Sequence, residues 1–523
     1  MSPLPDWLDP LPDASRQRAA DEWAIVEQGV PSLDLMERAG TGLTRLVEEI
    51  VPDGRIGVVV GKGNNGGDGL VAARLLREAG REVDVLAVGA IDELRGDPKA
   101  NLERLPGDPP RPFTPEALHG AAGAVDALLG TGFSGEPRDP IKGAIEALEA
   151  RDELAVVAAD VPSGVDASTG EVHGAAVHAR ATATFHRAKP GLWIAPGKEH
   201  AGGVRVIEIG IPAGAPEEAD VGLISPRALR GVPQRIAGST KFSEGAVLVV
   251  GGSLGLTGAP SMASESAQRA GAGYVTACVP RSLNYVFELR LLEAMSVPLP
   301  DEDGALGADA IDAALERAER ADAMVLGPGL GRADASLEFA REIAARVRLP
   351  LLLDADGLNA HAGRLEDLAS RDAPAVLTPH AGELARLLEI DSAAVGARRL
   401  AHAREAAGRC QAVVLLKGDD TIVATPEGPV GVSRGGSAAL ATAGTGDVLS
   451  GVIGALLAKR LHPFHAACAG TWLHATAGRV AAERLGADVV IARDVIEALP
   501  EARRQTRSPV RPPVPAGGST ALP

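Results

Sequence analysis

Glycine, asparagine and aspartate are crowded into one short segment, Gly61–Gly69, which follows an apolar run and precedes a helical pattern. The apolar run Ile56–Val60 predicts a buried strand, and the residues Leu70–Leu76 have the spacing of a helix. The segment therefore predicts a strand, a ligand-binding loop and a helix, which is the repeating unit of a parallel α/β sheet.

The first six residues of this loop satisfy the G-x-G-x-x-G spacing of dinucleotide-binding turns, and Asp84 lies near the position of a ribose-binding acid. That spacing alone is weak evidence, because glycines also serve tight packing of a strand on a helix. The loop further contains Asn64, Asn65 and Asp68. These side chains add oxygen atoms and a negative charge where a bare pyrophosphate prefers amide donors, so a nucleotide together with a cation fits better.

The same alternation of apolar strands and Ala/Leu/Arg-rich helices continues along most of the chain, after a helical stretch from Ala14 to Gly40. Strands are predicted in the first half at Ile56–Val60, Val83–Val88, Ala124–Leu129, Ala155–Ala159, Ala181–Phe185 and Val204–Ile209, and in the second half at Ala246–Val250, Met324–Leu326, Leu351–Leu353, Ala375–Leu377 and Val413–Leu416. Alternation of this kind predicts mostly parallel sheets covered by helices.

The pattern dissolves into Pro, Gly, Ala and Glu between Pro212 and Ser239, and a chain of 523 residues is too long for one core. We therefore predict two α/β domains, at residues 1–222 and 225–503, joined by a linker. Residues 504–523 are rich in Pro, Arg, Ser and Gly and are expected to form a disordered tail.

Composition excludes several classes of function. The formal charge of −17 and the 2% aromatic content argue against nucleic-acid binding, which needs clustered cations or stacking platforms. The three cysteines, Cys278, Cys410 and Cys468, are far apart and lack C-x-x-C spacing, so neither a disulfide framework nor a zinc site is expected. With no export signal and no membrane-spanning apolar run, we expect a cytoplasmic protein.

Three predicted strands of the first half end in polar glycine turns, which converge at one edge of a parallel sheet. Asn65, Asp126 and Ser163 supply oxygen ligands without a soft donor, which suits a hard cation such as K⁺, Na⁺ or Mg²⁺. Asp160, at a strand end before Pro162, is the candidate acid or base, with a turn-capping carboxylate as the equally weighted alternative.

The ordered motifs of the first half are Met36–Gly40, Gly63–Gly69, Asp126–Gly132, Asp160–Gly164 and Lys189–Gly191, and over about residues 10–215 they resemble the NAD(P)H-hydrate epimerase family. The resemblance implies K⁺ binding by Asn65, Asp126 and Ser163, and proton transfer by Asp160. It also implies contacts to the hydrated nicotinamide nucleotide from a set of loop residues, to which we add Lys189, either as a neutraliser of pyrophosphate or as an ordinary exposed lysine. These substrate-binding residues are Asn64, Asn65, Gly66, Gly67, Asp68, Gly130, Thr131, Gly132, Phe133, Ser134, Gly135, Glu136, Asp160 and Lys189.

The second half contains a glycine turn, Gly444–Gly446, that runs into an apolar helix. Backbone amides at such a helix start form an anion hole, and Asp447 in the first turn is favoured as a carboxylate and therefore as a base, with a helix cap as the alternative. Lys417 at a strand end is a candidate phosphate clamp. His380 and the turn around Gly329 also follow strands, and either one fits ordinary turn chemistry.

Together with Thr257–Pro260, Arg269–Gly273 and Asp354–Asn359, these motifs resemble the ADP- or ATP-dependent NAD(P)H-hydrate dehydratase family, a branch of the ribokinase-like fold, over about residues 225–500. The resemblance implies ADP or ATP with Mg²⁺ as co-substrate and phosphorylation of the ring hydroxyl through Asp447. Nucleotide contacts are implied for Lys417, Gly418, Asp419, Asp420, Thr421, Gly444, Thr445 and Gly446, and substrate contacts for Ala259, Gly329, His380 and Asp447. The segment Arg434–Ala443 departs from the family pattern, which puts nucleotide contacts through that loop in doubt.

We therefore expect a Rossmann-like three-layer epimerase domain fused to a ribokinase-like α/β domain, acting on NADHX or NADPHX and assembling as a homo-oligomer. Two alternatives stay open. A small-molecule kinase would use a related glycine turn and aspartate. A first half that binds nucleotide without turnover would make that half a regulatory or scaffold domain.

Overall fold

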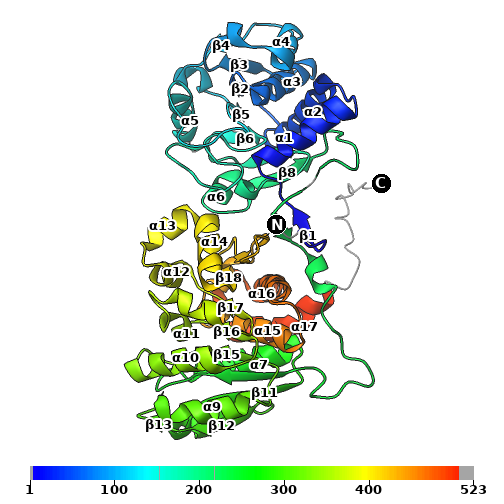
Figure 1. Cartoon of the computed structure of the whole chain (residues 1–523). Coiled ribbons are helices and arrows are strands. Elements are labelled where there is room, and N and C mark those ends of the chain that lie inside the picture. The colour runs from blue at the N-terminus through cyan, green and yellow to red at the C-terminus, as the bar shows by residue number, and fades with distance from the viewer. Residues whose placement is uncertain (1–3, 152, 217, 506–523) are drawn as a thin grey trace, which may run out of the picture. The chain divides into compact units, whose positions relative to one another are not determined.

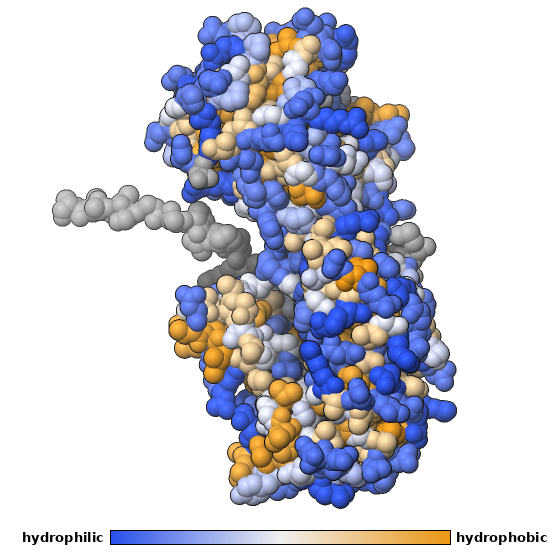
Figure 2. Space-filling model, turned by 90° about the vertical axis from the view of Figure 1, so that its left-hand side faces the viewer, coloured by the Kyte–Doolittle hydropathy of each residue, from blue (hydrophilic) through white to orange (hydrophobic). Residues whose placement is uncertain are grey.

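The computed structural model describes residues 4–151, 153–216 and 218–505, and these residues form two compact units. The first unit takes in the described chain up to Leu223 together with Glu389–Gly408 and Leu416–Arg434. The second takes in Ile224–Leu388, Arg409–Leu415 and the described residues from Gly435 onward. Figure 2 shows hydrophilic residues over most of the face that it presents, with apolar residues in separate patches.

The first unit is built on a parallel sheet whose strands lie in the order β4-β3-β2-β5-β6-β7-β8. Its strands are β2 (Ile56–Val60), β3 (Val83–Ala87), β4 (Arg111–Pro112), β5 (Gly123–Ala127), β6 (Ala155–Ala159), β7 (Ala181–Phe185) and β8 (Gly203–Ile207). The chain order runs outward from β2 in one direction and from β5 in the other. The loops after β2 and β5 therefore diverge at a topological switch point, where open parallel sheets bind ligands.

Helices cover both faces of this sheet, so the unit has three layers (Figure 1). One core lies under α2 and α3 and includes Val58 and Val60 of β2; the other lies under α5 and includes Val59. The helices are α1 (Ala14–Glu22), α2 (Ser32–Ile50), α3 (Asn64–Glu78), α4 (Gly96–Glu103), α5 (Ile141–Glu149) and α6 (Gly197–Ala201). This arrangement confirms the predicted three-layer α/β domain.

Helix α3 begins at Asn64, so the predicted ligand loop is short and most of the Gly61–Gly69 segment is the first part of a helix. The glycines permit this close approach. A Cβ on Gly66 would lie 2.0 Å from the carbonyl oxygen of Gly61, and one on Gly69 would lie 2.6 Å from the Cβ of Ala127. Asp84 has another role than ribose binding, because it lies near the start of β3 and pairs with Arg55 and Arg111.

The segment predicted as a linker contains a strand, β9 (Val221–Ile224). It pairs in parallel with β20 (Val430–Val432), which pairs in antiparallel with β19 (Ile422–Ala424). Strand β1 (Leu8–Pro10) is followed by Leu11, whose N–H donates to the carbonyl oxygen of Val221 at 2.9 Å. The helices α13 (Ser392–Ala397) and α14 (Arg399–Cys410) precede β19 and β20 in the sequence.

The second unit also has a parallel sheet with helices on both faces. Its paired strands are β10 (Ala246–Val250), β11 (Tyr274–Pro280), β12 (Met295–Leu299), β15 (Ala323–Leu326), β16 (Leu351–Leu353), β17 (Ala375–Leu377) and β18 (Val413–Leu416), and a small hairpin joins β13 (Asp301–Glu302) to β14 (Ala305–Leu306). Strands β11 and β12 were not predicted.

In Figure 1, α10, α11 and α12 lie on one side of β15–β17, and α15 and α16 lie on the other. The helices are α7 (Gly258–Ala270), α8 (Asn284–Arg290), α9 (Ile311–Ala318), α10 (Asp334–Arg346), α11 (Asp356–Asn359), α12 (Ala381–Leu388), α15 (Thr445–Ala458), α16 (Pro463–Leu485) and α17 (Ala492–Gln505). Helix α17 includes the first two residues of the predicted tail, and residues 506–523 of that tail lie outside the described residues. Among the described residues, none of the helices combines the length and the apolar character needed to cross a membrane.

Candidate active sites

A cavity of about 1210 Å³ opens in the first unit at the switch point between β2 and β5. It exceeds the ~300–1000 Å³ typical of small-molecule pockets, so it has room for a dinucleotide-sized ligand. Of the predicted substrate-binding residues, it is lined by Asn64, Asn65, Asp68, Gly130, Thr131, Gly132, Phe133, Ser134, Gly135, Glu136, Asp160 and Lys189.

Gly66 and Gly67 do not belong to the lining. Gly66 packs on Gly61, and a Cβ on Gly67 would lie 2.7 Å from the side chain of Met36. Both glycines allow the close packing of α3.

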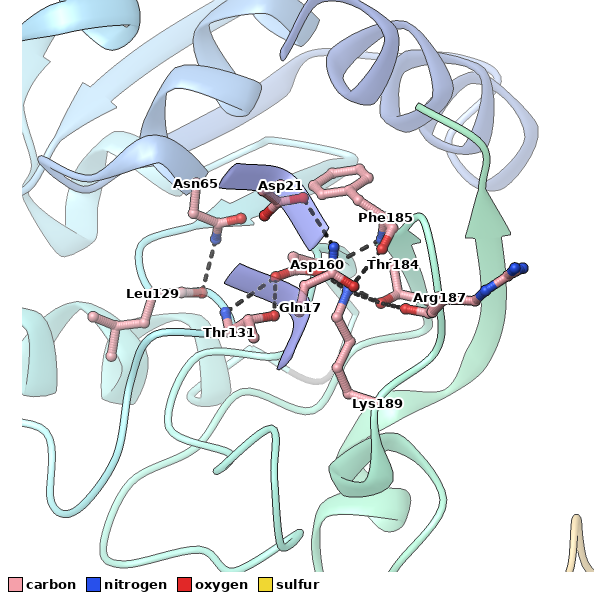
Figure 3. A network of polar contacts seen from close by, with 10 residues as sticks. All are labelled: Gln17, Asp21, Asn65, Leu129, Thr131, Asp160, Thr184, Phe185, Arg187 and Lys189. Atoms are coloured by element: carbon pink, nitrogen blue, oxygen red, sulfur yellow. Dashed lines mark hydrogen bonds and ion pairs between the residues drawn. The ribbon is translucent and has the colours of Figure 1, made fainter. Parts of the chain in front are cut away.

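Asp160 follows β6 in the left-handed backbone region, with φ of 64°, which costs a non-glycine residue about 1–3 kcal/mol. Its carboxylate is held from both sides. Oδ1 lies 2.6 Å from Nζ of Lys189, and Oδ2 accepts from the backbone N–H of Thr131 at 3.0 Å and from the Thr131 hydroxyl. Burial raises the pKa of Asp160, but the Lys189 ammonium and the Thr131 donors outweigh it and hold the pKa below its usual range. Asp160 is therefore a carboxylate (Figure 3).

Lys189 is not an exposed lysine, because only 1% of its surface is accessible. Besides Asp160, its ammonium donates to the carbonyl oxygen of Phe185 at 2.9 Å and to Oγ1 of Thr184 at 3.0 Å. The three contacts account for all three N–H donors, so Lys189 holds Asp160 in place.

Asp126 and Ser163 lie beneath the cavity wall, and Asn65 forms part of that wall. Oδ1 of Asp126 lies 2.6 Å from Oγ of Ser163, and Oδ2 accepts from the Ser163 backbone N–H at 2.8 Å. Nδ2 of Asn65 donates to the carbonyl oxygen of Leu129 at 2.7 Å, and Leu129 N–H donates to Oγ of Ser163 at 2.9 Å. The structure thus joins the three predicted ligands through the β5–α5 turn.

Oδ1 of Asn65 is buried and has no hydrogen-bond partner among the described residues. Burial raises the pKa of Asp126 to about 6. An orphaned amide oxygen and a buried carboxyl that gains from a nearby positive charge both fit a hard cation at this point.

Two further carboxyl groups line the same cavity. Burial, followed by repulsion from Asp160 and Asp21, raises the pKa of Asp68 well above its usual range. Burial also raises the pKa of Asp21, on α1, against the lowering effect of its hydrogen bond from Gln17. Sequence analysis did not single out Asp21 or Gln17, and the only signal is that they stand one helical turn apart.

In the second unit, Gly329 and Ala259 are neighbours across two loops. Gly329 has φ of 62°, and a Cβ there would lie 3.3 Å from the Cβ of Ala259 and 2.4 Å from the carbonyl oxygen of Leu256. Oγ of Ser253 donates to the Gly329 carbonyl at 2.9 Å. The structure therefore brings these two predicted substrate-contact residues together.

Gly444 is the N-cap of α15, with φ of 91°, so Asp447 lies in the first turn of that helix as predicted. Gly451 of the same helix packs on α7, where a Cβ would lie 2.0 Å from the carbonyl oxygen of Ala263. Next to this contact, Oγ of Ser450 donates to Oδ2 of the buried Asp354 at 2.7 Å. These contacts fix the start of α15 against the sheet and so place Asp447.

His380 caps helix α12. Its ring atom Nδ1 accepts from the backbone N–H of Gly382 at 3.0 Å, and its backbone N–H donates to Oε2 of Glu383 at 2.8 Å. The reciprocal pair is a capping arrangement, so the turn chemistry left open by the sequence is present, while over half of the imidazole stays exposed.

The predicted nucleotide loop Lys417–Thr421 follows β18 and lies within the first unit. The strand itself belongs to the second unit as far as Leu415. Asp420 is buried, pairs with Nε of Arg399 at 2.8 Å and accepts from the N–H of Ala195 at 2.9 Å. Asp419 pairs with Lys198. Both carboxylates are thus engaged with protein groups.

Comparison with known proteins gives two family matches and many relatives. The family described as "NAD(P)H-hydrate dehydratase" matches residues 247–501, and the family described as "YjeF-related protein N-terminus" matches residues 32–191. The chain is 39% identical to the bifunctional NAD(P)H-hydrate repair enzyme of Moorella thermoacetica over 97% of this chain and 99% of that protein. The corresponding enzymes of Salinibacter ruber and Escherichia coli are 40% and 35% identical, over 94% and 90% of this chain and 95% and 89% of their own lengths.

Among solved structures, the chain is similar to an ADP/ATP-dependent NAD(P)H-hydrate dehydratase from Bacillus subtilis that was co-crystallised with ATP and Mg²⁺. The two are 27% identical, with 54% of this chain and 98% of that chain covered and a TM-score of 0.48.

Proposed function

The chain belongs to the family of bifunctional NAD(P)H-hydrate repair enzymes, and from this membership we propose how its two sites divide the work. The protein interconverts the R and S forms of NAD(P)H hydrate and dehydrates the S form to NAD(P)H with hydrolysis of ADP or ATP. We assign epimerisation to the first half, residues 1–222, and dehydration to the second, residues 225–503.

The observation that carries the epimerase assignment is the Asp160 carboxylate, held by Lys189 and Thr131 at the wall of a dinucleotide-sized cavity. Asp160 accepts the proton of the ring hydroxyl while the bond from the hydrated carbon to the ring nitrogen breaks, with its electron pair going to the nitrogen. It returns the proton when that bond re-forms on the other face of the carbon. Its two fixed partners keep one orientation of the carboxylate toward the cavity, which is the positioning that proton transfer needs.

We propose K⁺ as the cation held by Asn65, Asp126 and Ser163. The support is the orphaned Oδ1 of Asn65 and the all-oxygen donor set, which suit a hard monovalent ion. When bound, the ion would supply positive charge at the switch point.

In the second half, Asp447 removes the proton of the ring hydroxyl while that oxygen attacks the terminal phosphorus of ADP or ATP, and the bridging phosphorus–oxygen bond breaks to release AMP or ADP. The lone pair of the ring nitrogen then breaks the carbon–oxygen bond and releases phosphate, and loss of a proton from the adjacent carbon restores the dihydronicotinamide. We propose that the amides of Gly444–Gly446 stabilise the transferring phosphoryl group and that Mg²⁺ accompanies the nucleotide.

The compartment and the assembly are proposals of the same kind. Three buried free cysteines and an acidic chain suit a reducing cytoplasm. A homo-oligomer stays a prediction, which light scattering of the full chain tests.

The decisive experiment incubates the full chain with a mixture of NADHX epimers, with and without ADP or ATP, and follows each epimer by chromatography and NADH by its absorbance. With nucleotide, we expect both epimers to be consumed and NADH to form. Without nucleotide, we expect R and S to equilibrate and no NADH to appear. An isolable phosphorylated product that does not decay to NADH would favour the kinase alternative.

Asp160→Asn tests the residue behind the first step. It should slow the R-to-S conversion by about a hundredfold, the scale of losing a general base. Clearance of the S epimer with nucleotide should be unchanged in the same chain. If the first half only bound nucleotide without turnover, the wild-type chain and the variant would clear R at the same spontaneous rate.

A further inference from the structure

Helix α1 brings two polar side chains to the wall of the first cavity, outside the span that the epimerase-side family match covers. Gln17 and Asp21 stand four residues apart and therefore on one face of the helix. Nε2 of Gln17 donates to Oδ1 of Asp21 at 3.0 Å, which fixes which end of the Gln17 amide is nitrogen. Figure 3 shows the pair beside Asp160 and Lys189.

Gln17 is 6% exposed, and its Oε1 has no hydrogen-bond partner among the described residues. A buried acceptor without a hydrogen bond costs about 1–3 kcal/mol of stability, so such an atom needs an explanation. Because Gln17 lines the cavity, a small turn of its side chain brings this acceptor to a donor on the bound ligand.

The pair lies at the reacting end of the cavity. Asp21, Asp160 and Lys189 all line the same cavity, and Figure 3 shows them side by side. The missing donor therefore belongs to the part of the ligand that meets Asp160 rather than to a remote nucleoside.

The hydrated nicotinamide ring carries two kinds of donor, the N–H₂ of its carboxamide and its hydroxyl. The two substituents stand on opposite sides of the six-membered ring. Since the proposed function gives the hydroxyl-bearing side to Asp160, the carboxamide is left for another residue.

Resting on that proposed function, we propose that Gln17, oriented by Asp21, accepts a hydrogen bond from the carboxamide N–H₂ of the substrate and thereby sets which ring enters the site. Gln17 is then a specificity residue that touches substrate. Asp21 is a positioning residue that holds the nitrogen end of the Gln17 amide and so leaves its oxygen for the substrate.

The test uses the full chain, Gln17→Met, and two substrates: NADHX and the hydrate of the 3-acetylpyridine analogue of NADH, in which a methyl group replaces the amide N–H₂. With NADHX, the variant should raise KM about tenfold, the scale of one lost hydrogen bond, with a much smaller change in kcat. With the analogue, Gln17→Met and the parent chain should have the same KM. Gln28 is an exposed glutamine of the following segment, so Gln28→Met is the matched control and should leave KM unchanged for both substrates.

Gln17→Glu keeps an acceptor oxygen and should retain more of the preference for NADHX than Gln17→Met. Asp21→Asn, which keeps an oxygen for Nε2 of Gln17, should behave like the parent, whereas Asp21→Leu should resemble Gln17→Met. A urea midpoint of the first unit equal to that of the parent, followed by tryptophan fluorescence in a Trp472→Phe background, reports that each variant is folded.

Equal KM increases for both substrates, or none for NADHX, would overturn the proposal, because Gln17 would then meet the hydroxyl, the ribose or nothing. A parent chain that fails to equilibrate the epimers would overturn the proposed function instead. The two failures are therefore told apart by the parent chain alone.

Discussion

Nζ of Lys189 lies 2.6 Å from Oδ1 of Asp160, in an ion pair of which the lysine end is 99% shielded from solvent. Removing one partner of a buried pair leaves the other charge without compensation, which typically costs about 3–5 kcal/mol. Lys189→Met should therefore lower the free energy of unfolding of the first unit by that amount. The double variant Asp160→Asn/Lys189→Met should lose less, because no charge stays buried alone.

Urea unfolding, followed by tryptophan fluorescence in a Trp472→Phe background, measures this effect for the first unit. Arg205→Met is the control, because Arg205 pairs with Glu49 in a bridge that is over half exposed on both sides, and it should cost less than about 1 kcal/mol. Equal losses for the single and double variants would contradict the assignment of the cost to an unpaired charge.

Asn65→Ala should weaken the response of the epimerase to K⁺. The variant loses the orphaned Oδ1 proposed as a ligand, so we expect the K⁺ concentration for half-maximal activation to rise about tenfold, the scale of one lost polar contact. K⁺ is titrated against choline at constant ionic strength. Asn64→Ala is the matched control, because its side chain is exposed and should leave the K⁺ response unchanged. An unaltered titration in Asn65→Ala would place the cation elsewhere.

Asp68→Asn should flatten the pH dependence of stability. Burial and the neighbouring carboxyls raise the folded-state pKa of Asp68, so above the unfolded pKa of about 4 the folded chain keeps a proton that the unfolded chain has released. Stability then falls as pH rises through this window, toward the folded pKa. The variant lacks this contribution. Urea midpoints between pH 5 and pH 8 should fall more steeply in the parent than in Asp68→Asn, while Asp53→Asn, at an exposed site, should follow the parent.

Asp447→Asn should cut nucleotide-dependent NADH recovery by about a hundredfold, because it removes the proposed base. Epimerisation in the same chain should be unchanged. If Asp447 only stabilised its helix end, the variant would keep its turnover. Asp334→Asn, in the first turn of α10, is the matched control for that structural effect and should leave turnover intact. Parent-like turnover in Asp447→Asn would remove the residue from the mechanism.

The solubility of an isolated second half should depend on the residue at which the fragment begins. A fragment of residues 213–505 keeps β9, whose Val221 and Leu223 stand opposite Val430 and Val432 of β20. A fragment of residues 225–505 leaves that edge of β20 bare, and unpaired edges promote aggregation. We expect the longer fragment to give the higher soluble yield and to dehydrate the S epimer. Equal yields and unfolding midpoints would show that β9 contributes nothing.

Local patterns were sufficient to predict much of the two sheets. Ile56–Val60 and Ala155–Ala159 are strands with the bounds predicted, because each is an apolar run closed by turn residues. Strands β9 and β20 were missed, since both are short, lie in glycine- and proline-rich surroundings and acquire their partners from distant parts of the chain.

The site residues that follow predicted strands could be predicted from the sequence, whereas those that depend on distant contacts could not. Asn65, Asp126, Ser163 and Asp160 follow or flank predicted strands, so topology alone brings them to one edge. Gln17 and Asp21 stand on a helix with the polar composition of a solvated face, and only the docking of α1 against the cavity gives them a function. Nor does the sequence distinguish a buried Lys189 from an exposed one, because that depends on Asp160 being placed opposite.

The pairing of β9 with β20 also has a consequence for the order in which the chain folds during synthesis. The seven strands of the first sheet have all been made once Ile207 has left the ribosome, but β9 then waits for a partner that lies far ahead. Roughly 200 residues separate the two strands, and at typical rates of translation that interval is about 10–40 s. For that time the edge of β9 that pairs with β20 stays bare, and chaperones have their opportunity to bind there.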